Sequence, residues 1–174
     1  YNGDTLILVP DKLEGDVLIR EGTTRIIYDS LNGLVSADDK KMSISVPSSV
    51  TNIESRINLN INKFIVSDNN NYSSRDGVLF NKDGTTLISV PSYYEKLEYV
   101  IDAENISSYA LMNNIILKTI TLTDSVKSIE RNAIYGREEL GIRKVINNSS
   151  VLFSNYYYDT DYDITVETND GTQS

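Results

Sequence analysis

Residues 64–91 read FIVSDNNNYSSRDGVLFNKDGTTLISVP, and this stretch decides how the chain folds. Residues 78–80 and 86–90 are short runs of residues that favour β-strands, and Asp83-Gly84 lies between them. Because glycine adopts positive φ without steric cost, the sequence predicts a tight turn there and a hairpin around it. The whole stretch predicts a strand, a polar turn, a strand, a tight turn and a strand, in that order.

Internal repeats relate this stretch to the rest of the chain. Residues 43–54 match residues 119–130 at a spacing of 76 positions without a gap. Residues 5–10 echo residues 86–91 at a spacing of 81 positions. The two spacings indicate two long units of about 80 residues that follow one another.

A shorter repeat lies within the second unit. A shift of 23 positions aligns residues 97–111 with residues 120–134, so that Tyr99 corresponds to Leu122. This shift lies in the window of roughly 20 to 29 residues that is typical of leucine-rich repeats. The pattern indicates that each long unit is itself a group of short coils.

Each coil carries one short strand. Within residues 119–122, Ile120 and Leu122 lie on one face of a strand and the two threonines on the other. A single coil cannot cover its own apolar edge, so neighbouring coils must stack to form a core. We therefore expect parallel stacked strands at Ile44, Tyr99 and Ile120. Residues 129–136 have room for a helical turn that Gly136 would end.

Several motifs resemble a known family. Residues 68–88 resemble the inter-repeat segment of BspA-like leucine-rich repeats, a module of bacterial surface and secreted proteins. Residues 48–53 and 124–129 resemble the family's Pro-x-Ser-Val-Thr-x-Ile turn, and residues 132–140 resemble its Ala-Phe-x-x-Cys-x-x-Leu element. The chain departs from the family at the Phe, which is Leu111 or Ile134 here, at the missing Cys, and in a degenerate coil at residues 55–61.

The resemblance implies a mainly β leucine-rich-repeat solenoid. Its parallel strands would lie on one face, with short helical or irregular turns on the other and inserted β-hairpins. We expect the solenoid to cover residues 1–146 in two irregular units, about 1–79 and 80–146. Residues 147–174 match the repeats poorly and are expected to be a C-terminal cap or the start of a following segment. The start at Tyr1 and the polar end suggest a processed or excised piece of a longer protein.

The composition excludes several classes of function. The 174 residues include neither Cys nor His, which excludes thiol chemistry and Ser-His-Asp or Cys-His catalysis. The formal charge of −9 argues against a nucleic-acid partner, and no apolar run is long enough to span a membrane. Glu138-Glu139 is better explained as a charged surface loop than as a catalytic pair. We expect no enzymatic activity, no catalytic residues and no cofactor.

Two other patterns have both a structural and a functional explanation. Asp159, Asp161 and Asp163 resemble the start of a calcium loop, with Asp170 at its twelfth position. Ile164 stands where that loop needs Gly, and its bidentate Glu is missing, so no metal site is expected. A strand explains the pattern better, with Tyr162, Ile164 and Val166 facing the core.

Tyrosine occurs 12 times, with clusters at residues 93–94 and 156–158. Exposed tyrosines would suit a binding face or a carbohydrate platform, because each offers rigid area and a hydroxyl group. Packing in half-buried strands is the alternative that we favour.

The candidate binding residues lie on the outward face of the predicted strands. Small polar side chains there suit either ligand contact or simple solvation. We select this face because solenoids commonly bind through such surfaces. The candidates are Ser43, Ser45, Lys63, Glu98, Thr119 and Thr121.

The function that the resemblance implies is a noncatalytic extracellular protein-binding or adhesion module of a bacterial cell-surface or secreted protein. Its partner would be a host or bacterial surface protein, with a glycan as a second option. The alternatives are a structural spacer or stalk domain and an accessory carbohydrate-binding domain.

Overall fold

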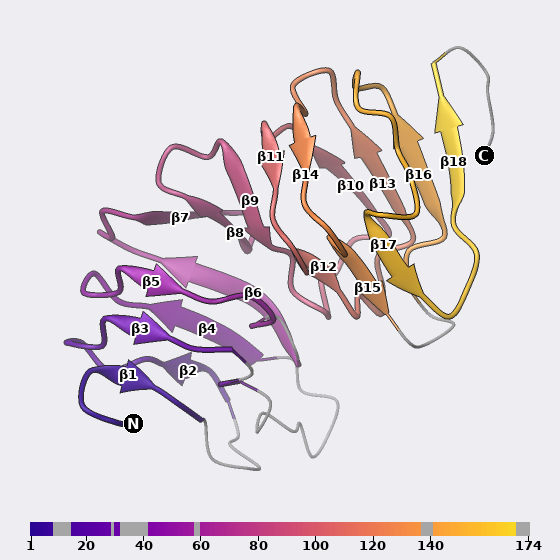
Figure 1. Cartoon of the computed structure of the whole chain (residues 1–174). Coiled ribbons are helices and arrows are strands. Elements are labelled where there is room, and N and C mark those ends of the chain that lie inside the picture. Colours follow the sequence, from indigo (N-terminus) through magenta and orange to yellow (C-terminus); the bar gives the residue numbers. More distant parts are fainter. Residues whose placement is uncertain (9–14, 29, 32–41, 58–59, 137–140, 170–174) are drawn as a thin grey trace.

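The chain folds into two stacks of β-strands with a hairpin between them (Figure 1). The computed structural model describes residues 1–8, 15–28, 30–31, 42–57, 60–136 and 141–169. All regular elements among these residues are strands. The first and last strands of the described residues lie at opposite ends of the molecule (Figure 1).

The N-terminal stack consists of two three-stranded parallel sheets. One has the order β1-β3-β5 and the other the order β2-β4-β6. Successive strands of one sheet come from successive coils, as expected of a solenoid. The strands are β1 (Thr5–Leu6), β2 (Val17–Leu18), β3 (Arg25–Ile26), β4 (Met42–Val46), β5 (Asn52–Ile53) and β6 (Ile61–Val66).

The C-terminal stack has three sheets. A four-stranded parallel sheet has the order β10-β13-β16-β18, and a three-stranded parallel sheet has the order β12-β15-β17. The third sheet has the order β14-β11-β9-β8-β7, in which only the hairpin strands β7 and β8 add antiparallel pairs. The strands are β7 (Tyr72–Arg75), β8 (Val78–Asn81), β9 (Thr86–Ser89), β10 (Glu98–Ile101), β11 (Asn105–Ile106), β12 (Leu111–Met112), β13 (Thr119–Leu122), β14 (Ser128–Ile129), β15 (Ile134–Gly136), β16 (Lys144–Asn147), β17 (Tyr158–Thr160) and β18 (Thr165–Thr168).

Strand β8 separates two hydrophobic cores and contributes side chains to both. Its side chains alternate, so that Leu79 packs into the core of the N-terminal stack while Val78 and Phe80 pack into the core of the C-terminal stack. All three side chains are almost fully buried. The run of three apolar residues therefore belongs to a strand with a core on each side, as in sheets that are covered on both faces.

The hairpin turn that precedes β8 follows from its sequence. Asp76 and Gly77 both have positive φ, 51° and 79°, and the two-residue loop joins paired residues Arg75 and Val78. This is the geometry of a type I′ turn, for which Asp-Gly is a preferred pair. The sequence predicted a polar turn here and did not predict β7, because this strand is polar and, among the described residues, pairs only with β8.

A buried asparagine attaches the same segment to the N-terminal stack. The side-chain amide of Asn69 donates to the carbonyl oxygens of Pro47 and Val50, both at 2.8 Å. Its side-chain oxygen accepts from the backbone N–H groups of Asn71 at 2.7 Å and Tyr72 at 3.0 Å. The side chain of Asn69 thus makes all of its hydrogen bonds to backbone groups, and these bonds join the turn at residues 47–50 to the start of β7.

The predicted parallel solenoid is confirmed, with corrections to its register. Tyr99 pairs with Ile120 at a spacing of 21 residues, not with Leu122 at 23. The shift of 23 holds after the strand, where Ile106 pairs with Ile129. The difference arises in the turn, which has three residues between β10 and β11 but five between β13 and β14.

Three further predictions can be compared with the strands. Tyr99 and Ile120 are stacked parallel neighbours as expected, whereas Ile44 lies in the separate sheet of the N-terminal stack. The prediction of a helical turn at residues 129–136 is wrong, since β14 and β15 occupy the two ends of this segment and pair with β11 and β12. Strands β17 and β18 extend two sheets beyond residue 146. The division of the chain at residue 146 stays a prediction.

Candidate binding surfaces

The outward face of the four-stranded sheet carries two rows of side chains. Tyr99 and Ile101 point into the core from β10, so Glu98 and Val100 point outward, and the other strands alternate in the same way. The register places the outward residues side by side. One row is Glu98, Thr119, Lys144 and Thr165, and the other is Val100, Thr121, Ile146 and Glu167.

This face brings together three of the six candidate residues. Glu98 is exposed, and Thr119 and Thr121 are partly exposed beside it. Val100, which is 58% exposed, is an apolar member of this face that was not among the predicted residues. Lys144, which forms an ion pair with Glu167 at 2.9 Å, was not among them either.

The other three candidates lie on the outward face of the N-terminal sheet β2-β4-β6. Ser45 lies in register between Leu18 and Ile65, both exposed, and Lys63 is exposed as well. Ser43 is only 1% exposed, although it points outward. Its backbone N–H donates to the Asp16 carboxylate at 3.1 Å. Hydrogen bonding to Ser43 lowers the pKa of that carboxyl group.

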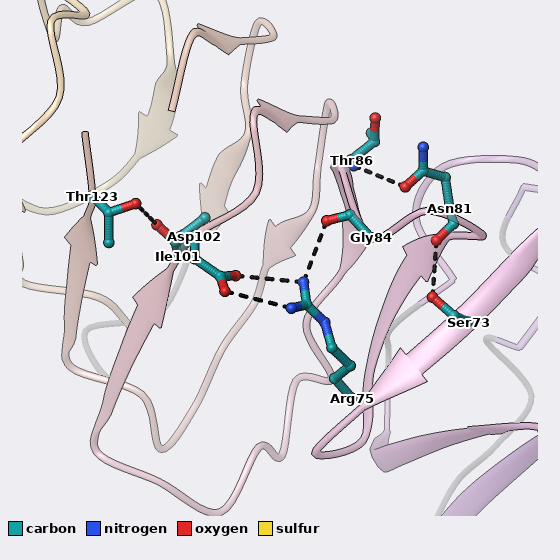
Figure 2. Close-up of polar contacts among 8 residues, drawn as sticks. All are labelled: Ser73, Arg75, Asn81, Gly84, Thr86, Ile101, Asp102 and Thr123. Atoms are coloured by element: carbon teal, nitrogen blue, oxygen red, sulfur yellow. Dashed lines mark hydrogen bonds and ion pairs between the residues drawn. The ribbon is translucent and has the colours of Figure 1, made fainter. Parts of the chain in front are cut away.

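The hairpin is fixed against the four-stranded sheet by Arg75 (Figure 2). Its guanidinium donates to both carboxylate oxygens of Asp102 at 3.4 Å and to the Gly84 carbonyl oxygen at 3.3 Å. The same guanidinium lies 4.2 Å from the centre of the Phe80 ring. A second ion pair, between Lys96 and Asp76 at 3.0 Å, holds the tip of the hairpin.

A contact between the N-terminal and C-terminal stacks is built around Arg56. Its guanidinium carbon lies 4.0 Å from the ring centre of Tyr109, 5.1 Å from that of Tyr28 and 5.6 Å from that of Tyr135. Arg56 also donates to the Tyr28 hydroxyl at 2.7 Å. Hydrogen bonds from Asn132 and then from Arg56 lower the pKa of Tyr109. These residues join coils of both stacks.

Arg56 and Tyr109 occupy equivalent places in their coils. Both have φ near +60° and follow a strand isoleucine, Ile53 or Ile106, by three residues. The degenerate coil at residues 55–61 thus keeps the backbone geometry of a regular one at this position. The repeat is not visible in the sequence at this position, because Arg56 and Tyr109 share a backbone conformation but not a side-chain type.

The tyrosine clusters do not form one flat platform. Tyr94 is only 3% exposed and packs edge-on against Tyr99, with ring centres 5.3 Å apart. Tyr156 is exposed, but its ring stands at 83° to that of Tyr157. Packing is therefore the better account of Tyr94, as expected, and the C-terminal tyrosines form a compact cluster rather than a plane.

The acidic residues near the C-terminus also have a structural explanation. Ile164 and Val166 are buried and Tyr162 packs against the core, as the strand interpretation predicts, although β18 begins only at Thr165. Among the residues that the structure describes, no cluster of three or more acidic, Cys or His side chains could hold a metal ion. Glu138, Glu139 and Asp170 lie outside the described residues. In the described part of the chain, no helix is long and apolar enough to cross a membrane.

Comparisons with known proteins identify the fold. A scan against protein-family models finds no match, and a search of curated proteins finds none either. Among solved structures, the chain is similar to a leucine-rich repeat protein from Eubacterium ventriosum, with 22% identity and a TM-score of 0.55. The match covers 79% of this chain and 43% of that one. The chain has the leucine-rich-repeat fold.

A second leucine-rich-repeat structure agrees with this result. A leucine rich cell surface protein from Faecalibacterium prausnitzii is 16% identical with a TM-score of 0.50, over 89% of this chain and 60% of that one. The leucine-rich-repeat fold expected from the BspA-like motifs is thereby confirmed. The chain spans 43% and 60% of the lengths of these two structures. In a leucine-rich-repeat solenoid, each coil adds one strand to an extended surface that is available for binding.

Proposed function

We propose that the chain is a noncatalytic protein-binding or adhesion module that binds through the outward face of the four-stranded sheet. The observation that supports this is the outward row of Val100, Thr121 and Ile146, which begins at the edge strand β10 and has the charged side chains of Glu98, Lys144 and Glu167 next to it. Protein interfaces typically combine apolar residues with polar and charged residues on one surface. The two rows lie on a rigid parallel sheet, so little ordering is needed on binding.

The N-terminal sheet repeats the same arrangement. Leu18 is 78% exposed and Ile65 is also exposed, with Ser45 between them. Single exposed apolar residues are normal on protein surfaces. Their recurrence at outward positions of both sheets supports a binding role for this side of the solenoid. A stable interface of ordinary size needs about 800 Å² from each partner, which favours a partner that covers several strands.

The chemistry of the chain supports a role without catalysis. It has no Cys and no His, and the described residues contain no candidate metal cluster. One similar structure is described as a cell surface protein, which supports display at the surface of a bacterium or secretion from it. We propose a host or bacterial surface protein as the partner, with a glycan as the second option.

The spacer function is supported by one observation. Strands β1 and β18 lie at opposite ends of the molecule, as a stalk requires (Figure 1). A carbohydrate-binding role receives less support, because Tyr94 is buried and Tyr156 is not coplanar with its neighbour.

Binding assays on matched variants test the proposal. The chain would be immobilised and exposed to matrix proteins, host cells, bacterial cells and glycans. Val100→Asp should abolish capture, whereas Leu8→Asp, at an exposed apolar residue outside both outward rows, should leave it unchanged. Absence of capture from all four sources by the wild-type chain would exclude the adhesion function and favour the spacer.

A further inference from the structure

Strand β10 has an open edge in the middle of the chain. Among the described residues it pairs only with β13, and the structure describes all of residues 60–136 around it. The Thr119 N–H of β13 donates to the Leu97 carbonyl oxygen at 3.0 Å. Since backbone groups alternate in direction along a strand, the N–H and C=O groups of Glu98 and Val100 face away from β13.

These backbone groups of Glu98 and Val100 have no hydrogen-bond partner among the described residues. Buried backbone groups are almost always paired, so unpaired ones lie where water reaches them. The side chains agree with this conclusion, because those of Glu98 and Val100 are both exposed. The edge therefore offers two donors and two acceptors to a strand from outside.

The β7–β8 hairpin closes the edge of β6 but not that of β10. The Phe64 N–H of β6 donates to the Gly77 carbonyl oxygen at 2.8 Å, and the Val66 N–H donates to the Ser74 Oγ at 3.1 Å. Within each stack, the strands of successive coils pair directly, whereas β6 and β10 do not pair. The hairpin thus interrupts the series of paired strands and leaves β10 without a partner from the preceding coil.

Two exposed ion pairs join the hairpin to the ends of β10. Figure 2 shows Arg75 at the end of β7 reaching Asp102, which directly follows β10. Lys96, before the strand, is paired with Asp76 at the hairpin tip, and all four side chains are half exposed or more. Exposed ion pairs contribute little to stability, so both can open to admit a strand.

The carboxylate of Glu98 favours a basic residue in the strand that is added. Opposite charges on directly opposed residues of neighbouring strands attract, and like charges repel. Glu98 has no ion-pair partner among the described residues. The nearby cations are engaged elsewhere: Lys96 with Asp76, Lys118 with the Ile115 carbonyl oxygen, and Lys144 with Glu167.

We propose that β10 captures an extended basic segment of a partner protein as a further parallel strand. The segment takes the place that a strand of the preceding coil would fill, with Lys or Arg opposite Glu98 and an apolar residue opposite Val100. Strand addition supplies main-chain hydrogen bonds, and the two side-chain positions supply the preference. This inference rests on the proposed function, because it states how a partner attaches to the edge strand of the same sheet face.

Hydrogen exchange of the free chain tests whether the edge is open. The amides of Glu98 and Val100 should exchange at least about tenfold faster than those of Tyr99 and Ile101, which face β13. Equal protection of all four amides would overturn the proposal, because the edge would then already be occupied.

Two hexapeptides with blocked ends serve as the added strand. The first is Thr-Lys-Thr-Val-Thr-Val, and the second has Glu in place of Lys. The Lys peptide should bind and slow exchange at Glu98 and Val100, while the Glu peptide should bind about tenfold more weakly. N-methylation of the threonines should abolish binding, because in a parallel pair their N–H groups face β10. N-methylation of Lys and Val, whose N–H groups point away, should leave binding in place.

Matched variants locate the site. Glu98→Gln should weaken binding of the Lys peptide about twofold to fivefold, whereas Asp124→Asn, at an exposed carboxylate elsewhere, should have no effect. An equal effect of the two variants, or protection of amides on another strand, would overturn the proposal. Failure of both peptides to bind would overturn it as well, and the charges around the edge would then only protect it from pairing.

The results also separate this inference from the proposed function. Peptide binding at β10 without capture of any natural partner would support strand addition and exclude the adhesion function. Capture that is lost in Val100→Asp, by a chain that binds neither peptide, would support the sheet face and exclude strand addition.

Discussion

Replacing Gly77 by alanine should cost far more stability than the same replacement at Gly84, although the two glycines lie in the turns on either side of β8 and have similar positive φ. An alanine with φ of 79° or 73° costs about 1–2 kcal/mol in backbone strain at either position. At Gly84 the added methyl group would meet only the flexible end of Arg75, at 3.4 Å. We therefore expect Gly84→Ala to cost about 1–2 kcal/mol.

At Gly77 the added methyl group would lie 2.6 Å from the Lys63 Cβ and 3.2 Å from its Cα, which cannot move without moving β6. The Gly77 carbonyl also accepts from the Phe64 N–H at 2.8 Å, so the tip cannot retreat without losing this bond. Overpacking of this kind adds about 1–3 kcal/mol, for a total of about 2–5 kcal/mol. Urea unfolding of both variants measures the difference. Equal losses would refute the close contact between the hairpin tip and β6.

Three other predictions concern the buried groups. Asn69→Asp should lower the free energy of unfolding by about 2–4 kcal/mol, because it replaces the donor to two carbonyl groups by a carboxylate. The control Asn70→Asp, at an exposed residue, should lower it by less than about 0.5 kcal/mol. Urea unfolding measures both. Leu79→Ala and Phe80→Ala should each lower the free energy of unfolding by about 2–5 kcal/mol. Hydrogen exchange should rise first in the N-terminal stack for Leu79→Ala and first in the C-terminal stack for Phe80→Ala. Identical exchange patterns would contradict separate cores. Burial raises the pKa of Tyr99, so the folded state keeps a proton that the unfolded state loses above about pH 10. The stability that this group contributes is complete at neutral pH and falls as the pH rises beyond about 10. Tyr99→Phe should therefore reduce the loss of stability between about pH 8 and about pH 11, unless the hydroxyl ionises freely in the fold.

The sequence was sufficient to predict the solenoid because apolar alternation and turn chemistry are local. Residues 43–54 and 119–130 have buried apolar side chains at three matching pairs of positions, Ile44 and Ile120, Val46 and Leu122, and Val50 and Val126. The Asp-Gly pair predicts its turn because the turn type demands positive φ. Strand β7 shows the limit of this reasoning, since a polar strand gains its structure from the partner that it pairs with.

The register could not be predicted because the coils differ in length on each side of the solenoid. Paired residues Glu98, Thr119, Lys144 and Thr165 are spaced by 21, 25 and 21 positions. Insertions in a turn cost little free energy, so the strands keep their pairing while the number of residues between them changes. A fixed shift therefore misses the strands at Lys144 and Thr165, and with them half of the outward face.

The candidate surface was only partly predictable for a different reason. Outward position follows from alternation, and Glu98, Thr119 and Thr121 were found in this way. Exposure depends on neighbours from distant coils, which explains why Ser43 points outward and is buried. The Arg56 and Arg75 contacts join segments that are far apart in sequence, and no local pattern predicts them.

The proposed sheet-face interaction is tested most directly by side-chain footprinting with hydroxyl radicals, on the free chain and on its complex with a captured partner. Val100, which is 58% exposed, and Ile146 in the same outward row should lose most of their labelling in the complex, while labelling of Leu8 stays unchanged. Unchanged labelling of Val100 and Ile146 in a complex that protects another surface would contradict the account.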